Sequence, residues 1–170
     1  RKTVLELRKL LEEDDTVVQV SVSETKIRFA AEGISLVSKV IDGTFPDYSR
    51  VIPVGNPRRL EVDAAEFAHA VDRVATVSAE RARAVKMALT EDRLVLSVTD
   101  PEKGQATEEL AVTYADEPLE IGFNARYLLE IAGQVDRENA VFLFNGSGDP
   151  TLVREGDDDS AVYVVMPMRV

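Results

Sequence analysis

The sequence lacks several residue types on which common active sites depend. It has no cysteine, which excludes disulfides, thiolate zinc sites and cysteine nucleophiles. It has no tryptophan, and its six phenylalanines and four tyrosines make for a mainly aliphatic core. The one histidine, His69, cannot build a zinc site alone, and we interpret it as an exposed helical side chain. These absences favour a protein with neither a bound metal nor a cofactor.

Long apolar runs are also missing. No stretch reaches the roughly 18 residues that a membrane-spanning helix needs, and the longest runs, such as residues 161–168, suit strands. The chain does not open with the charged and then apolar segments of a signal peptide, so we expect a cytoplasmic protein. Hydrophobic residues make up 45% of the chain and charged residues 30%, a balance that permits a buried core.

Positive charge is scarce. The chain has 20 Lys and Arg against 31 Asp and Glu, which gives a net charge of -11. A surface this acidic repels DNA phosphates at long range. The composition therefore argues against tight nucleic-acid binding over a whole face, but it allows loose binding through a local basic strip.

Three helix-start signals recur at intervals of about 60 residues, which indicates an internal repeat. Thr3 and Asp63 each stand three residues before a Glu, the arrangement of a capping box. Asn124 is a third favourable N-cap. An amphipathic segment follows each cap, so the sequence predicts three helices.

The predicted strands complete a β-α-β-β-β unit. We expect strands over 17–23, 26–32 and 34–42 after the first helix, over 84–90, 94–99 and 107–114 after the second, and over 140–144, 151–155 and 161–168 after the third. Segments 59–62 and 119–123 precede the second and third helices as leading strands. Antiparallel sheets with helices on one side make this an α+β fold.

Two such units can pair into one domain. We expect repeats two and three to form a complete domain over residues 54–170, with 54–57 as the linker. Residues 1–53 then form half of a preceding domain, because the first repeat lacks a leading strand. The chain also begins with Arg, so we interpret it as a fragment of a longer protein. An N-terminus that simply lacks that strand is the alternative.

Two motif-like segments do not predict catalysis. The acidic run 157–159 lacks the spaced ligands and the glycine of a calcium loop, so we interpret it as a hairpin tip. The segment 146–150 is rich in glycine but lacks the lysine and the following helix of a phosphate loop, so a tight turn is the better interpretation. No polar catalytic cluster is recognisable, and we do not expect an enzyme.

Two other features are compatible with binding. Basic residues lie roughly opposite the apolar stripes of the predicted helices, although a generic solvated face explains them about as well. The second feature is the apolar C-terminus, where Pro167 should stop strand pairing because it has no N–H to donate. Either this segment is a short tail after a core strand, or Met166, Pro167 and Met168 line a groove for a partner.

Three sequence blocks resemble one known family. Residues 163–169 (Tyr-Val-Val-Met-Pro-Met-Arg), 41–53 and 119–124 match, in order and separation, the bacterial DNA polymerase III beta subunit, the replicative sliding clamp. The resemblance covers essentially the whole chain. It implies the DNA clamp fold, with repeated βαβββ units, antiparallel sheets outside and helices on the inner face.

The resemblance also implies a function. In this family each subunit has three domains, and two subunits close head-to-tail into a ring around duplex DNA, which is bound without sequence preference. The clamp is a non-catalytic processivity factor that tethers the DNA polymerase III alpha subunit, the clamp loader and other proteins with clamp-binding motifs. Those partners insert peptides into a cleft between the second and third domains. The alternative is a truncated clamp-like module that binds peptides without encircling DNA.

Candidate roles for individual residues follow from the resemblance and the helix faces. The peptide-binding cleft maps onto Pro46, Arg50, Val51, Asn124, Tyr127, Pro150, Val164, Val165, Met166, Pro167, Met168, Arg169 and Val170. The DNA-facing residues are Arg1, Lys2, Lys9, Arg73 and Arg126. The ring interface maps onto Thr76, Val77, Glu102 and Glu108.

Overall fold

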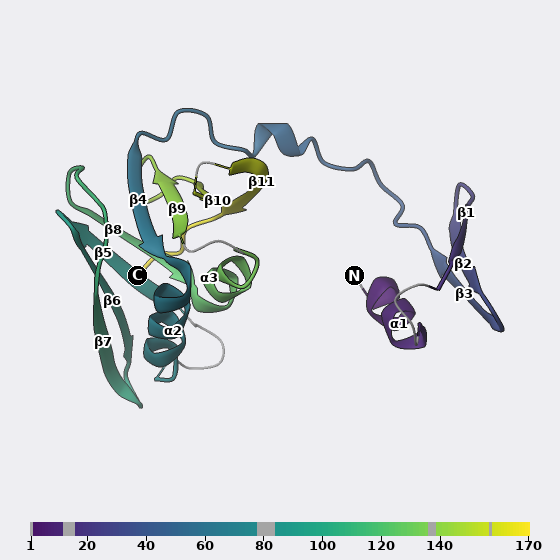
Figure 1. Ribbon diagram of the computed structural model, residues 1–170, viewed down its shortest axis with the longest axis horizontal. Coiled ribbons are helices and arrows are strands. Elements are labelled where there is room, and N and C mark those ends of the chain that lie inside the picture. The colour runs from purple at the N-terminus through teal and green to yellow at the C-terminus, as the bar shows by residue number, and fades with distance from the viewer. Residues whose placement is uncertain (1, 12–15, 78–83, 136–138, 157) are drawn as a thin grey trace. The chain divides into compact units, whose positions relative to one another are not determined.

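A computed structural model describes residues 2–11, 16–77, 84–135, 139–156 and 158–170. Arg1, a predicted DNA-facing residue, and Asp157 of the predicted hairpin tip lie outside this description. The chain divides into two compact units, Arg1–Pro46 and Asp47–Val170 (Figure 1). The predicted domain boundary between residues 53 and 54 falls inside the second unit, before its first strand, and it stays a prediction.

The first unit consists of one helix and one sheet. The helix α1 (Lys2–Leu10) precedes β1 (Gln19–Val22), β2 (Lys26–Ala31) and β3 (Ile34–Lys39), which form an antiparallel sheet in the order β1-β2-β3. These are the elements predicted for the first repeat. The predicted N-cap Thr3 is wrong, because Thr3 lies inside α1 and its hydroxyl hydrogen-bonds with that of Ser38 at 2.9 Å.

The apolar side chains of the first unit lie at its surface. None of the described residues between 2 and 46 is buried. Val4 of α1 is 63% exposed, and Val20 and Val37 of the sheet are more than half exposed. The amphipathic pattern of this repeat therefore has an apolar face but no core within the unit to cover it.

The second unit contains the other two repeats. A short 3-10 turn, η1 (Tyr48–Arg50), precedes them. The second repeat comprises β4 (Arg58–Asp63), α2 (Ala64–Ala75), β5 (Ala84–Thr90), β6 (Arg93–Asp100) and β7 (Gly104–Ala111). The third comprises β8 (Leu119–Asn124), α3 (Ala125–Ala132), β9 (Asn139–Phe144), β10 (Thr151–Glu155) and β11 (Asp158–Val165). The predicted β-α-β-β-β order is confirmed in both repeats.

Helices α2 and α3 begin where the sequence predicts. The carboxylate of Asp63 accepts a hydrogen bond from the backbone N–H of Glu66 at 2.7 Å, and the side chain of Asn124 accepts one from that of Arg126 at 3.0 Å. Each bond satisfies an N–H group that has no partner within the first turn of a helix. The two caps fix the junctions between β4 and α2 and between β8 and α3.

The leading strand of each repeat pairs in the sheet of the other repeat. The two antiparallel sheets have the orders β11-β10-β9-β4 and β7-β6-β5-β8. Leu60 of β4 lies opposite Phe142 of β9, and Ile121 of β8 lies opposite Met87 of β5. Because each sheet takes one strand from the other repeat, neither repeat can complete its backbone hydrogen bonds alone.

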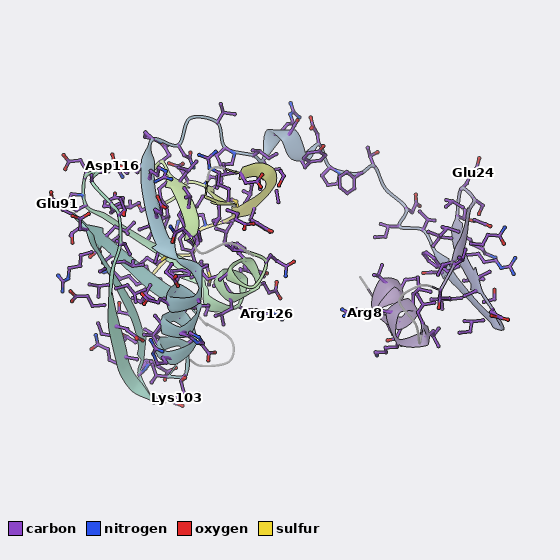
Figure 2. All side chains as sticks on the ribbon, viewed as in Figure 1. Arg8, Glu24, Glu91, Lys103, Asp116 and Arg126 are labelled. Atoms are coloured by element: carbon purple, nitrogen blue, oxygen red, sulfur yellow. The ribbon has the colours of Figure 1, made fainter. Side chains whose placement is uncertain are left out.

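Helices α2 and α3 pack against each other and against the sheets of the second unit (Figure 1). The rings of Phe67 on α2 and Phe142 on β9 lie 5.2 Å apart between centroids, so an aromatic pair joins the two repeats inside a mainly aliphatic core. Charged side chains lie in the connections between strands, with Glu91 and Asp116 at one end of the unit and Lys103 at the other (Figure 2). The predicted α+β clamp fold is confirmed.

Strands β3, β7 and β11 each end three residues earlier than predicted, and the segments after β7 and β11 close sheet edges. β7 and β11 end before residues 114 and 168, the predicted limits. Thr113 then forms an isolated bridge with Glu61 of β4, and Met168 forms one with Gly122 of β8. In each repeat the chain thus leaves its last strand and crosses to the outer edge of its own leading strand.

Candidate partner-binding groove

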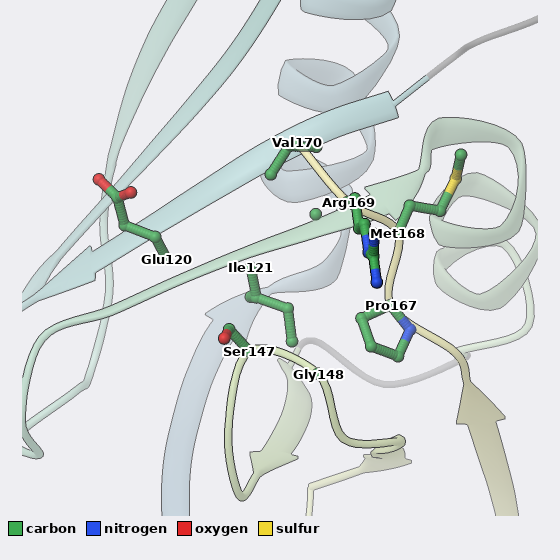
Figure 3. A pocket seen from close by; sticks show the side chains of 9 residues that line it. Glu120, Ile121, Ser147, Gly148, Pro167, Met168, Arg169 and Val170 are labelled. Carbon is green, nitrogen blue, oxygen red and sulfur yellow. The ribbon is translucent and has the colours of Figure 1, made fainter.

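A groove of about 620 Å³ lies beside the last residues of the chain (Figure 3). Strand β8, the loop between β9 and β10, and the segment after β11 form its sides. The residues that line it are Glu120, Ile121, Gly122, Ser147, Gly148, Pro167, Met168, Arg169 and Val170. We call residues 166–170 the C-terminal segment.

The C-terminal segment is held to β8 through its backbone. Val165, the last residue of β11, is buried, and the backbone N–H of Met168 donates to the carbonyl oxygen of Gly122 at 2.8 Å. Pro167 stands between them and cannot donate to a ladder, which explains why β11 ends here. Met166 is 56% exposed and Met168 37% exposed, so two adaptable thioether side chains remain accessible to a partner.

The loop between β9 and β10 is fixed by Asn56, which precedes β4. The side-chain amide of Asn56 donates to the carbonyl oxygen of Leu143 at 2.8 Å and to that of Pro150 at 3.0 Å. These two bonds tie β9, which precedes the loop, and Pro150, its last residue, to one side chain. The segment 146–150 is a turn between two strands, as predicted, and it supplies one wall of the groove.

The structure brings some predicted peptide-binding residues together. Residues 167–170 line the groove, and Pro150 lies in the loop that forms its wall. Asn124 and Tyr127 do not line it: Asn124 caps α3, and Tyr127 is 53% exposed on that helix. Whether these two residues contact a peptide stays a prediction.

The other predicted peptide-binding residues of the second unit do not line the groove. Arg50 and Val51 are exposed at the η1 turn, and Val164 is half-buried in β11. Pro46 is exposed at the end of the first unit. Their assignment to a peptide site also stays a prediction.

Reasoning from the sequence missed the β8 side of the groove. Glu120, Ile121 and Gly122 line it together with Ser147 and Gly148. One signal was present in the sequence, since a glycine inside a predicted strand often marks the close approach of another backbone. Gly122 is such a glycine.

Predicted DNA-facing residues form ion pairs with acidic neighbours. The ammonium nitrogen of Lys9 lies 3.2 Å from the carboxylate of Glu6 on α1. The guanidinium of Arg126, which extends from the outer side of α3 (Figure 2), lies 2.9 Å from the carboxylate of Glu130. Lys2 is exposed on α1. Pairs of this exposed kind are weak and do not prevent a cation from meeting a phosphate, but they lower the local positive potential.

The predicted ring-interface residues lie near the end of α2, on β7 and in the turn before β7. The guanidinium of Arg73, predicted to face DNA, makes a forked contact with Glu108 of β7, its Nε lying 2.9 and 3.0 Å from the two carboxylate oxygens. Thr76 is exposed, whereas Val77 is half-buried and packs against the core. Glu102 is exposed in the turn between β6 and β7. Their role at an interface stays a prediction.

The contact between Arg73 and Glu108 favours the charged form of both side chains. Hydrogen bonding to the guanidinium lowers the pKa of Glu108, and the same bond raises the pKa of Arg73. The carboxylate therefore stays ionised to a lower pH than a free glutamate. The charges of Arg73 and Glu108 therefore neutralise each other within the second unit.

The described part of the chain contains no group of three or more His, Asp or Glu side chains placed to hold a metal ion. Nor does any helix within it have the length and hydrophobicity required to cross a membrane.

Paired β-α-β-β-β repeats with exchanged leading strands define the clamp class of α+β folds. The chain belongs to the DNA polymerase III beta subunit family, whose C-terminal domain matches residues 49–169 and whose central domain matches residues 1–47. This family membership agrees with the prediction of a non-catalytic replication subunit rather than an enzyme.

Individual relatives support the assignment. The beta sliding clamp of Caulobacter vibrioides is 51% identical over 170 residues, which is 100% of this chain and 46% of the relative. That of Pseudomonas aeruginosa is 38% identical over the same length. The chain therefore spans about half the length of the curated relatives it matches.

Solved structures agree with the fold. The sliding clamp of Bartonella birtlesii bound to griselimycin has a TM-score of 0.90 and 49% identity, over 99% of this chain and 46% of that one. The DNA polymerase sliding clamp of Caulobacter crescentus has a TM-score of 0.89 and 50% identity, over 99% of this chain and 45% of that one.

Proposed function

We propose that this chain is part of a sliding clamp, a cytoplasmic DNA-replication processivity factor. The intact protein would close as a homodimer around duplex DNA. It would tether DNA polymerase III and other replication or repair proteins through a peptide-binding cleft. Identity of about one half to other sliding clamps over the whole chain supports this function.

The observation that carries the proposal is the groove beside the C-terminal segment. Its walls come from three separate parts of the third repeat, and Met168 and Val170 leave apolar surface exposed there, next to the exposed Met166. Exposed apolar side chains gathered at one place mark interaction sites, and methionine suits partners of varied shape. Griselimycin is bound in the structure of the Bartonella birtlesii relative, which is compatible with a ligand site on this fold.

A short peptide with Leu and Phe anchors fits the chemistry of this surface. Fully burying one such side chain contributes about 1.5–3 kcal/mol. Two or three anchors then leave roughly micromolar affinity after the peptide has been ordered. Arg169 lines the same groove and supplies a cationic edge.

The experiment is a titration of a fluorescein-labelled peptide carrying Leu and Phe anchors into the 170-residue chain and three variants. Met166→Ala and Met168→Ala should each weaken binding by about 1 kcal/mol or more, as interface hot spots do. Val162→Ala is the matched control, because Val162 is also apolar and 42% exposed on β11 but is not a predicted site residue. Equal affinity of the peptide for all four proteins would show that the C-terminal segment is not part of the binding site.

A second candidate function is a clamp-like module that binds peptides without encircling DNA. The net charge of -11 and the ion pairs of Lys9, Arg73 and Arg126 favour it. The two functions differ in DNA binding. A clamp segment should show weak, salt-sensitive binding to duplexes of any sequence, whereas a peptide module should show none at low salt.

A further inference from the structure

We propose that Gly122 positions the C-terminal segment and so sets the shape of the partner-binding groove. The positioning of the C-terminal segment by Gly122 concerns the fold alone. The effect on the groove rests on the proposed function, because it assumes that the groove receives a partner.

Gly122 has no conformational reason to be a glycine. It lies within β8, and it is not among the residues with a positive φ angle. A glycine inside a strand weakens the strand, because it adds backbone entropy to the unfolded chain and offers no side chain for packing. A glycine is often found inside a strand where another backbone passes close by.

The C-terminal segment is that neighbour. A Cβ atom on Gly122 would come closest to Cγ1 of Val170, and it would lie 2.7 Å from the carbonyl oxygen of Met168 and 2.8 Å from Cγ2 of Val170. The valine side chain could rotate, but the carbonyl oxygen belongs to the backbone that bonds to Gly122. A methyl group at this position therefore requires the segment itself to move.

The second repeat shows that the bridge alone does not require a glycine. Glu61 occupies the corresponding place on β4, and it carries a full side chain. It nevertheless bonds twice to Thr113, with its N–H donating at 3.0 Å and its carbonyl accepting at 2.9 Å. The requirement at Gly122 thus comes from the particular course of residues 168–170 across β8.

The groove depends on that course. Residues 167–170 form one of its walls (Figure 3), and residues 120–122 of β8 form another. If the segment is displaced from β8, the two walls separate, and the apolar side chains of Met168 and Val170 no longer face a fixed surface. Gly122 is therefore a positioning residue: its lack of a side chain is what allows the segment to lie against the strand.

The first experiment follows the backbone N–H of Met168 by hydrogen exchange in the 170-residue chain. Gly122→Ala should speed its exchange by about tenfold to a hundredfold, because overpacking of this kind weakens a local contact by that factor. Gly148→Ala is the matched control, since a Cβ there meets no atom within 4 Å although Gly148 lines the same groove. It should leave the exchange of Met168 unchanged.

A compensating variant tests the steric cause. Val170→Gly removes two of the three close contacts in the Gly122→Ala background, so the double variant should regain part of the lost protection at Met168. Thermal unfolding of each variant shows whether the second unit as a whole remains folded. If Gly122→Ala leaves the exchange of Met168 at the parent rate, the positioning role is overturned. If Val170→Gly restores no protection, the clash lies with the backbone carbonyl oxygen of Met168, which supports the positioning role.

The second experiment titrates griselimycin into the same proteins. Gly122→Ala should weaken its binding about tenfold or more if the segment shapes the site, and the double variant should recover part of that loss. Faster exchange with unchanged griselimycin affinity would overturn the link between segment and groove. If the parent chain does not bind griselimycin at all, the proposed binding function fails, while the exchange measurement still decides the positioning role.

Discussion

Arg73 on α2 and Glu108 on β7 form a forked ion pair that joins a residue predicted to face DNA to one predicted to lie at a ring interface. Side chains on β7 alternate, and Glu108 is one of the half-buried residues that face the helix, whereas Glu109 is exposed and pairs with Arg93. Two acidic residues adjacent in sequence therefore hold arginines on opposite faces of the same sheet. This arrangement allows the electrostatic role of one face to be tested against the other.

The first prediction concerns weak DNA binding. Glu108→Gln removes the anion that neutralises Arg73, so affinity for duplex DNA should rise and the slope of log K against log salt should steepen by about 0.9, the value for one more phosphate contact. Fluorescence anisotropy with a labelled duplex at several salt concentrations measures both quantities.

Glu109→Gln is the control for that prediction. It changes the net charge by the same amount and releases Arg93 on the other face of the sheet. It should leave the salt slope at the parent value. Equal steepening in both variants would mean that overall charge, and not the helix face, governs DNA binding.

The second prediction concerns acid. The pKa of Glu108 in the folded chain lies below its ordinary value of 4.5 because Arg73 hydrogen-bonds to the carboxylate. The pair therefore contributes stability above pH 4.5, and this contribution is lost as the pH falls through the lowered pKa of the folded chain. Urea unfolding of the parent and Glu108→Gln should differ by a constant free energy near neutral pH and converge in acid. If the difference in unfolding free energy between the two proteins grows as the pH falls, the hydrogen bond from Arg73 is not the cause of the lowered pKa of Glu108.

The third prediction concerns the exchanged strands. Phe142 of β9 lies opposite Leu60 of β4 and packs on Phe67, so it connects both repeats. Phe142→Ala should destabilise the second unit by about 3–5 kcal/mol. Hydrogen exchange should speed up in both sheets together, since neither repeat completes its hydrogen bonds alone. Loss of protection confined to the β9 sheet would show that the repeats unfold separately. Val162→Ala at the surface should change stability by no more than about 0.5 kcal/mol.

The fourth prediction concerns the first unit. Its helix and sheet leave Val4, Val20 and Val37 exposed, and β1 presents an open edge within the β1-β2-β3 sheet. Exposed apolar surface and open strand edges favour association. The 170-residue chain should therefore self-associate as its concentration rises, while residues 47–170 alone should remain monomeric. Sedimentation velocity of the two proteins makes the comparison, and identical behaviour would contradict it.

Local signals made most of the fold predictable. The capping residues Asp63 and Asn124 mark the starts of α2 and α3, and alternating apolar residues mark the strands. The prediction of Thr3 as an N-cap was wrong because its hydroxyl hydrogen-bonds to Ser38, which lies far away in the sequence. The same limit applies to the exchanged strands, since the sequence of β4 contains nothing that distinguishes β9 from β5 as its neighbour.

The groove was predictable only in part. The apolar C-terminal segment and the break at Pro167 were visible in the sequence, and residues 167–170 do line the groove. Its other walls depend on which strand the segment meets after it leaves β11. Backbone contacts such as that between Met168 and Gly122, and ion pairs such as that between Arg73 and Glu108, arise from the tertiary fold and leave no local signature.

The most direct test of the central claim uses the three methionines of the chain as reporters. Met166 and Met168 are exposed in the C-terminal segment, whereas Met87 is fully buried between β6 and β8 and serves as an internal control. Each methionine methyl group gives one NMR signal, which substitution to leucine assigns. Addition of the peptide with Leu and Phe anchors should shift the signals of Met166 and Met168 in a saturable manner and leave that of Met87 in place. A saturating concentration of peptide that moves neither exposed methionine would contradict the assignment of the partner site to the C-terminal segment.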